Sequence, residues 1–261
     1  MKNAQPTDAH FNVHALLDCA LFLDFDGTLV DLAPTPEQVV IAPELITSLR
    51  TIRALLDGRL AIVSGRPIAQ IDAMLGTITL PVAGVHGMER RDADGVLHTT
   101  PVPEFSAMQR CVLALAAVHP ALRVEQKRGA LALHYRQAPE LEAVCKSAML
   151  AALPNCPGVV LLHGKMVIEA KLGSVNKGTA IRDFLAESPF NDARPVFAGD
   201  DTTDEIGFAY VQEVGGMAIK IGAGASVAGY RIASPQALRA ELSHLARLAQ
   251  EPHHLSIAKG R

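Results

Sequence analysis

The sequence predicts an α/β protein in which a Rossmann-like core, built on a parallel sheet, is interrupted by an inserted α+β domain. Short apolar runs alternate with helix-period segments over residues 20–85 and again over residues 174–248, which is the pattern of strands joined by helical crossovers. Between these stretches, extended segments occur in consecutive pairs, which favours an antiparallel sheet. We therefore expect a discontinuous core, residues 1–100 and 172–261, and an inserted domain, residues 101–171.

The first half of the core is expected to contain three strands and two helices. Residues 20–24 form a short apolar run that ends in an acid, and a glycine follows nearby. This pattern is typical of a buried strand that ends in a loop. Residues 43–57 repeat apolar side chains at a helical period, with Pro43 in the first turn and Gly58 just past the end. The alternation of the two element types implies a parallel sheet. The other elements are a strand at 60–63, a helix at 67–75 and a strand at 82–85.

The pattern changes near residue 90, where residues 90–99 are typical of a hairpin around Asp94-Gly95. In the insert we expect helices at 104–118 and 139–153 and extended segments at 122–127, 130–136, 159–162 and 166–170. The core then resumes with a helix at 174–187, a strand at 195–198, a helix at 202–214, a strand at 217–221 and a helix at 235–248.

Composition argues against several classes of protein. The 261 residues carry 24 basic and 27 acidic side chains, a net charge of −3, and no dense basic run, so neither nucleic acid nor an anionic membrane is an expected partner. No apolar stretch approaches the ~20 residues that span a bilayer, and the first residues lack the apolar segment of a secretory signal, so a cytoplasmic location is expected. The four cysteines form no C-x-x-C pair and are expected to be reduced. A monomer is expected, although no sequence pattern fixes the oligomeric state.

Two aspartates directly follow the first predicted strand. Asp24 and Asp26 are two positions apart, so in extended geometry both carboxylates face the same way while Phe25 points into the core. Gly27 lets the chain turn away at this point. Two like charges at one strand end repel each other unless a cation or a shared proton compensates.

A second acidic segment, GDDTTDE at residues 199–205, follows another predicted strand. Both segments are then expected at the carboxyl edge of the sheet, where open α/β folds bind ligands. A cluster of carboxylates without His or Cys favours a hard cation, and Mg²⁺ is the expected ion. For Asp201 and Asp204, a purely structural role at a helix N-terminus is the alternative. The candidate metal residues are Asp24, Asp26, Asp200, Asp201 and Asp204.

Two further polar segments lie at expected strand ends or helix starts. The hydroxyl of Ser64, in Ser64-Gly65-Arg66, can face an anion at the N-terminus of the following helix. In Asn176-Lys177-Gly178, the Lys177 ammonium can neutralise a nucleophile and hold a phosphate. An ordinary surface salt bridge is the alternative for Arg66.

In this order, the segments DFDGT, SGR, NKG and GDDTTDE resemble the four motifs of the haloacid dehalogenase superfamily of phosphotransferases. The resemblance implies that Asp24 attacks phosphorus to give an aspartyl-phosphate, and that Asp26 protonates the leaving alcohol and then activates water. It also implies that Ser64 and Lys177 hold the transferring phosphoryl group. The Mg²⁺ ion would be held by Asp24, the Asp26 carbonyl and Asp200, with Asp201 or Asp204 close to it.

Charged residues alternate along the extended segments of the insert. Glu125 and Lys127 share one strand face, as do Lys165 and Glu169. Such paired acids and bases can bind hydroxyl-rich sugars, although the solvated face of a sheet is the alternative.

These segments, together with HYR at 134–136 and GVHGME at 84–89, resemble the trehalose-6-phosphate phosphatase family. That resemblance implies trehalose 6-phosphate as the substrate, with its phosphate bound in the core. The implied sugar contacts are Glu125, Lys127, Arg136, Lys165 and Glu169. In the core, the expected substrate contacts are Asp24, Phe25, Asp26 and Arg66.

Two alternative functions stay open at this point. The first is a phosphatase of another sugar phosphate, of the sucrose- or mannosylglycerate-phosphate type. The second is a non-catalytic sugar-phosphate sensor or a regulatory partner. The presence of both Asp24 and Asp26 argues against the second, because a binding module needs neither a nucleophile nor an acid.

Overall fold

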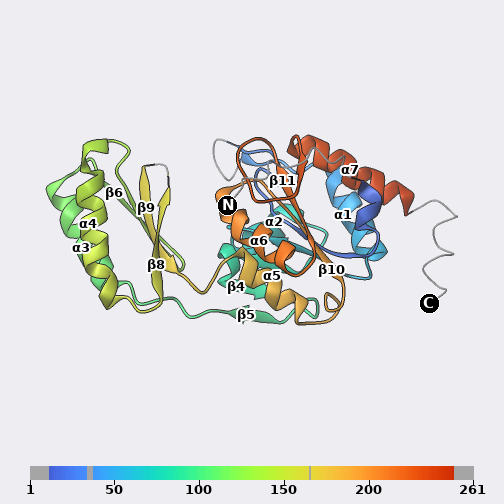
Figure 1. Cartoon of the computed structure of the whole chain (residues 1–261), viewed down its shortest axis with the longest axis horizontal. Coiled ribbons are helices and arrows are strands. Elements are labelled where there is room, and N and C mark those ends of the chain that lie inside the picture. The colour runs from blue at the N-terminus through green and yellow to red at the C-terminus, as the bar shows by residue number, and fades with distance from the viewer. Residues whose placement is uncertain (1–11, 34–37, 165, 250–261) are drawn as a thin grey trace. The chain divides into compact units, whose positions relative to one another are not determined.

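The computed structural model describes residues 12–33, 38–164 and 166–249 (Figure 1). The chain divides into two compact units, a larger unit of Met1–Thr99 with Asn176–Arg261 and a smaller unit of Thr100–Val175. Among the helices in the described ranges, none is both long enough and apolar enough to cross a membrane.

The larger unit is built on an eight-stranded sheet with the order β12-β11-β10-β1-β2-β3-β4-β5. The neighbours from β12 to β3 are parallel, and β4 and β5 continue the sheet as an antiparallel hairpin. The parallel-sheet α/β class is therefore confirmed. The strands are β1 (Cys19–Leu23), β2 (Leu60–Val63), β3 (Val82–Gly84), β4 (Glu89–Arg91), β5 (Leu97–Thr99), β10 (Arg194–Gly199), β11 (Met217–Ile221) and β12 (Tyr230–Ile232).

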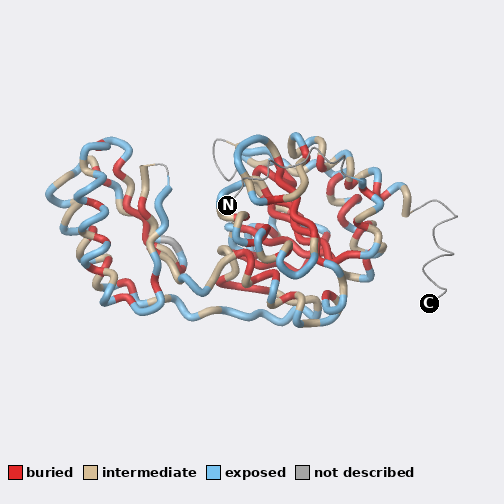
Figure 2. Tube along the Cα trace, viewed as in Figure 1, coloured by how far each residue is buried: buried red, intermediate tan, exposed pale blue. Residues whose placement is uncertain are grey.

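Alternate side chains of the central strand β1 enter two separate cores. Leu21 and Leu23 pack with residues of α1, α2 and α7, whereas Ala20 and Phe22 pack with residues of α5 and α6. Every residue of β1 is buried, because a parallel sheet covered by helices on both faces has no solvated side (Figure 2). The helices are α1 (Pro43–Leu55), α2 (Ile68–Leu75), α5 (Lys177–Leu185), α6 (Glu205–Glu213) and α7 (Pro235–Leu248).

The smaller unit has a four-stranded antiparallel sheet with the order β6-β7-β9-β8. Its two helices lie side by side against one face of this sheet (Figure 1). Leu131, Leu133 and Ile168 point to that face and are fully buried against Met108 and Met149. Among the described side chains, the opposite face carries Arg123, Glu125, Glu169 and Lys171. The elements are α3 (Ser106–Val118), β6 (Arg123–Lys127), β7 (Ala130–His134), α4 (Glu142–Ala152), β8 (Val159–Gly164) and β9 (Val167–Leu172).

Several elements differ from the sequence-based expectation. The strand β12 and the 3-10 turn Val13–Leu16 were not predicted, because three or four residues are too short to show a period. The helix expected at 202–214 starts as a 3-10 turn, Thr202–Asp204, and becomes α-helical only from Glu205. This turn places acidic side chains at the edge of the sheet.

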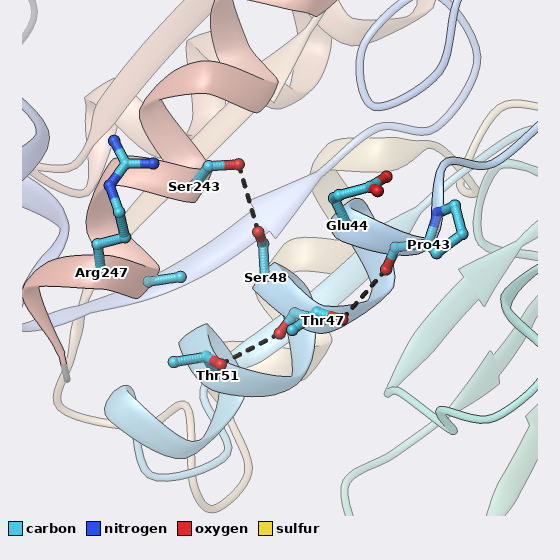
Figure 3. Close-up of a pocket in the computed structure, with 8 residues that line it drawn as sticks. Pro43, Glu44, Thr47, Ser48, Thr51, Ser243 and Arg247 are labelled. Carbon is cyan, nitrogen blue, oxygen red and sulfur yellow. Dashed lines mark hydrogen bonds between the residues drawn. The ribbon is translucent and has the colours of Figure 1, made fainter.

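A polar groove of about 390 Å³ lies between α1 and α7 (Figure 3). Its hydroxyl groups are already occupied within the fold: Thr47 and Thr51 donate to backbone carbonyls one turn earlier, and the hydroxyl oxygens of Ser48 and Ser243 are 3.4 Å apart. This groove therefore offers few free donors to a ligand, in contrast to the pocket at the carboxyl edge of the sheet.

Candidate active site

Three predicted site residues directly follow three adjacent parallel strands. Asp24 comes after β1, Ser64 after β2 and Asp200 after β10. In the register of these strands, Leu23 is paired with both Ala198 and Ile62, so all three strands end at the same level. The sheet itself thus brings together residues that are up to 176 positions apart (200 − 24) in the sequence.

A tight turn after β1 allows two acidic loops to approach each other. Gly27 has a φ of +76°, a conformation that residues with a side chain rarely adopt. A Cβ atom at this position would lie 2.2 Å from Oδ2 of Asp200. Glycine is therefore required here both for the turn and for the close approach of the Asp200 carboxylate.

Lys177 joins the two acidic loops. Its Nζ donates to Oδ1 of Asp24 at 2.7 Å and to Oδ1 of Asp204 at 2.5 Å, and all three side chains are almost completely buried. Lys177 is the first residue of α5, whose N-cap is Asn176 in a capping box with Thr179. Because a cation is unfavourable at a helix N-terminus, this placement needs the two carboxylates to stabilise it.

The electrostatics of this group follow from burial. Burial raises the pKa of Asp24 to about 6, against the opposing effect of the nearby Lys177 ammonium. Burial and the Asp24 charge together raise the pKa of Asp204 to about 6. For Lys177, burial by itself would lower the pKa, but the two carboxylates outweigh it and the pKa is raised above its ordinary value.

Asp24, Asp200 and Asp204 form a carboxylate cluster in which one oxygen from each lies within 4.8 Å of the others. The Thr28 hydroxyl lies 3.3 Å from an oxygen of Asp24 and 3.3 Å from an oxygen of Asp200, and its single proton can serve only one of them. Burial and the charge of Asp204 raise the pKa of Asp200. Three acids facing the single ammonium of Lys177 leave an excess of negative charge that a bound cation can balance.

Asp204 and Asp201, both in the GDDTTDE segment, have different partners. Oδ2 of Asp204 accepts from the Asp201 backbone amide at 2.9 Å, and Oδ1 of Asp201 accepts from the Thr202 amide at 2.7 Å. Asp204 thus holds both Lys177 and the loop, whereas the exposed Asp201 caps the 3-10 turn and lies outside the carboxylate cluster. The structural alternative fits Asp201 better than a place at the metal.

Lys220 was missed by sequence reasoning. It is buried on β11, and its Nζ donates to the backbone carbonyl of Asp200. The available signal was a single lysine in the strand MAIKI, whose five residues are all buried. A buried charge in such a strand is costly unless it has a specific partner, and here the partner is the loop that carries the cluster.

Arg66 and Asp26 form a bidentate ion pair, with 2.6 Å from Nε to Oδ2 and 2.7 Å from Nη2 to Oδ1. The Ser64 hydroxyl oxygen accepts from the Arg66 backbone amide at 3.1 Å. Ser64 is buried, and its hydroxyl proton remains available to an anion. The Phe25 side chain is fully buried in the core, as expected from its place between Asp24 and Asp26, so a substrate contact at this position would use its backbone.

Residues from the DFDGT, SGR, NKG and GDDTTDE segments line a pocket of about 400 Å³ in the larger unit. His86 also lines this pocket. Val85 and His86 have φ values of 50° and 54°, which cost energy for residues other than glycine. Their amides donate to the carbonyls of Arg66 and Ser64 at 3.0 and 2.9 Å, so this turn fixes the SGR loop. The lining residues are Asp24, Asp26, Leu32, Ser64, Gly65, Arg66, His86, Lys177, Asp200, Asp201 and Thr203.

In the smaller unit, two of the predicted sugar contacts lie in one row of the sheet. Glu125 is paired with Ala132, which is paired with Glu169, so both carboxylates are on the face that the helices do not cover. Nε2 of His134 is 3.0 Å from Oε2 of Glu125. Arg136 is exposed just after β7. Lys165 lies outside the described residues, and of Lys127 only the backbone pairing with Ala130 is described.

The larger unit and its parallel sheet have the fold found in solved phosphatases of the haloacid dehalogenase superfamily. A phosphatase of this superfamily from Bacteroides thetaiotaomicron is similar with a TM-score of 0.60 at 14% identity, over 94% of this chain and 99% of that one. The C-terminal domain of trehalose-6-phosphate phosphatase from C. albicans is similar with a TM-score of 0.72 at 22% identity, over 94% and 99%. At these identities the likeness concerns the fold.

The chain belongs to the trehalose-phosphatase family, whose sequence model matches residues 22–236. It is 42% identical to trehalose-6-phosphate phosphatase of Escherichia coli (strain K12) over 216 residues, 82% of this chain and 81% of the relative. It is 40% identical to the probable trehalose-phosphate phosphatase of Sinorhizobium fredii (strain NBRC 101917 / NGR234) over 233 residues, 88% of each chain. The prediction of an enzyme of this kind is confirmed.

The contact between Lys220 and Asp200 yields a prediction. Replacing Lys220 by Met removes the donor to the Asp200 carbonyl. We expect the free energy of unfolding to fall by about 1–3 kcal/mol and phosphatase activity to decrease. Denaturant unfolding and steady-state kinetics measure the two effects. Lys220→Arg keeps a donor and should retain more of the stability and more of the activity than Lys220→Met. Equal losses in the two variants would contradict the importance of this contact.

Proposed function

We propose that this chain is a Mg²⁺-dependent phosphatase that hydrolyses trehalose 6-phosphate to trehalose and phosphate through an aspartyl-phosphate on Asp24. The observation that carries the proposal is the buried Asp24 carboxylate held by Lys177 beside Asp200, in a chain of the trehalose-phosphatase family. A carboxylate is a usable covalent nucleophile, and two displacements replace one difficult hydrolysis.

In the first displacement, a carboxylate oxygen of Asp24 forms a bond to phosphorus while the bond between phosphorus and the sugar oxygen breaks. Asp26 gives its proton to that sugar oxygen, and trehalose leaves as the alcohol. General acid catalysis of this kind contributes about 10²–10⁴-fold. Both residues line the same pocket, two positions apart at the end of β1.

In the second displacement, Asp26 takes a proton from water as the water oxygen bonds to phosphorus. The bond between phosphorus and Asp24 breaks, which restores the carboxylate and releases phosphate. Asp26 is then protonated and ready for the next substrate. One carboxyl group thus serves as acid and base in turn, and no proton is lost or gained over the full cycle except those exchanged with phosphate in solution.

Lys177 and Ser64 are proposed to hold the transferring phosphoryl group. Lys177 keeps one ammonium proton beyond the two that it donates to Asp24 and Asp204. The Ser64 oxygen accepts from the Arg66 amide, which orients the hydroxyl while leaving its proton for a phosphate oxygen. Fixed donors that face the developing charge supply the larger part of catalysis in phosphoryl transfer.

The donor set fits a hard divalent cation. All of its side-chain atoms are carboxylate oxygens, without His or Cys, which favours Mg²⁺ over Zn²⁺. Asp24, Asp200 and the Asp26 carbonyl are the proposed ligands. Asp204 is left out because it is fully buried and does not line the pocket, and its two oxygens accept from Lys177 and the Asp201 amide. When bound, Mg²⁺ would neutralise charge on the phosphoryl oxygens.

For the sugar, we propose that the open face of the smaller unit supplies the contacts. Its row Glu125, Ala132, Glu169 places a small residue between two carboxylates, which leaves room for hydroxyl groups that donate to them. The family relatives at 40–42% identity carry trehalose phosphate in their names, which favours this sugar over sucrose or mannosylglycerate phosphate. The pair Asp24 and Asp26 disfavours a non-catalytic sensor.

The substrate and the nucleophile are tested together. We expect phosphate release from trehalose 6-phosphate to exceed that from sucrose, mannosylglycerate and simple hexose phosphates by at least about tenfold in kcat/KM. Asp24→Asn should abolish release from all of them while keeping the thermal unfolding profile. Similar turnover of the whole panel would refute the narrow substrate, and an active Asp24→Asn variant would refute the mechanism.

The proposed metal site is tested by the pH dependence of the stabilisation that Mg²⁺ gives to the folded protein. Asp24 and Asp204 have raised pKa values of about 6 in the folded protein, against 3.8 as ordinary values. The folded state therefore binds protons that the unfolded state does not, so without metal these groups stabilise the fold below about pH 4 and less so as pH rises through about 6. Added Mg²⁺ competes with these protons and should raise the Tm more at about pH 7.5 than at about pH 5.

Differential scanning fluorimetry with and without Mg²⁺ measures this shift. Asp200→Asn should largely remove it, while Asp72→Asn, which alters an acid that does not line the pocket, should not. A Tm shift that is the same at both pH values, or that persists in Asp200→Asn, would exclude this cluster as the metal site.

The sugar contacts are tested with Glu169→Ala. The substitution removes one carboxylate from the open face of the smaller unit, so kcat/KM for trehalose 6-phosphate should fall at least about tenfold while that for 4-nitrophenyl phosphate stays nearly constant. Glu140→Ala, an exposed acid elsewhere in the same unit, is the matched control. Equal losses for both substrates would assign Glu169 to the solvated face of the sheet.

A further inference from the structure

We propose that Arg66 is a positioning residue for Asp26, the proposed general acid, and not primarily a ligand of the substrate. The inference rests on the proposed function. Its observation is the bidentate pair in which Nε and Nη2 of Arg66 donate to the two oxygens of Asp26 at 2.6 and 2.7 Å. Such a planar fork fixes the orientation of a carboxylate as well as its place.

The orientation of the Asp26 carboxylate depends on its contact with Arg66. Its side chain is 31% exposed, and within the part of the chain that the structure describes, Arg66 is the one side chain that hydrogen-bonds its carboxylate. An exposed carboxylate without a fixed partner would sample several rotamers. The pair leaves each oxygen a second lone pair, so Asp26 can still carry and transfer a proton.

Arg66 is itself held from several directions. Its side chain is only 11% exposed, and its guanidinium carbon lies 6.0 Å from the ring centre of the buried Phe25. Its backbone amide donates to the Ser64 hydroxyl, and its carbonyl accepts from Val85 in the strained turn at 3.0 Å. Strain of this kind persists only where the surrounding structure enforces it, so Arg66 is a rigid support for Asp26.

Positioning of Asp26 and direct binding of the substrate predict different losses of activity when Arg66 is replaced. The two roles differ in how that loss depends on the leaving group of the substrate. In the first displacement, the proton moves from Asp26 to the bridging oxygen as the bond between that oxygen and phosphorus breaks. A poor leaving group needs this proton, whereas a nitrophenolate departs without it. In kcat/KM, which reports the steps up to departure of the leaving group, a misplaced Asp26 therefore slows mainly the substrates with poor leaving groups, while a lost contact to the phosphoryl group slows all of them alike.

The experiment compares Arg66→Met with the unaltered protein on a series of substituted phenyl phosphates, which differ in leaving group but little in size. We expect kcat/KM for phenyl phosphate to fall at least about tenfold more than that for 4-nitrophenyl phosphate. Arg66→Lys keeps the charge but not the fork, and it should restore only part of the loss.

Two further variants make the outcome decisive. The double variant Arg66→Met with Asp26→Asn should lose no more than Asp26→Asn alone, because Arg66 acts through Asp26. Arg91→Met is the matched control, since Arg91 makes a similar bidentate pair with Asp72 at 2.6 Å but does not line the pocket. It should leave the dependence on the leaving group unchanged.

Equal losses of Arg66→Met across the series, or losses that add to those of Asp26→Asn, would overturn the positioning role and return Arg66 to the substrate. Failure of the proposed function looks different. In that case Asp26→Asn itself would show no dependence on the leaving group, and Asp24→Asn would remain active.

Discussion

The site depends on one buried interaction, in which the Lys177 ammonium lies between the carboxylates of Asp24 and Asp204. Removing the Lys177 ammonium would leave two buried carboxylates without a counter-charge, which costs about 3–5 kcal/mol, whereas loss of one carboxylate leaves the ammonium paired with the other. Asp24 belongs to the first segment of the larger unit, whereas Lys177 and Asp204 belong to the second. The interaction therefore joins the two parts of the chain that the smaller unit separates, and it links folding of the larger unit to assembly of the catalytic group.

Three basic residues hold the two acidic segments of the pocket. Lys177 holds Asp24, the proposed nucleophile, Arg66 holds Asp26, and Lys220 holds the carbonyl of Asp200. These contacts fix the acids but do not cancel all of their charge, because Asp24, Asp200 and Asp204 remain clustered around the single ammonium of Lys177. That residual charge is the physical reason to expect a divalent cation, since a phosphate anion would otherwise enter a region of like charge.

The sequence was sufficient to predict the parallel sheet and the residues at its strand ends, because buried strands and the motifs that follow them are local patterns. Contacts between distant segments carry no such pattern. The pairing of Arg66 with Asp26 spans 40 positions, and Lys220 reaches Asp200 only because β10 and β11 are neighbours. The separate roles of Asp201 and Asp204 depend on a 3-10 turn of three residues, which is too short to recognise from spacing alone.

The central claim is that Asp24 becomes covalently phosphorylated. Mixing the protein with radiolabelled trehalose 6-phosphate, quenching in acid within the first turnover and mapping the label by peptide mass spectrometry tests it directly. The account predicts an acid-stable, base-labile phosphoryl group on the peptide that contains Asp24, and none when that residue is replaced by Asn. Phosphate release without any labelled protein, or a label on another residue, would contradict it.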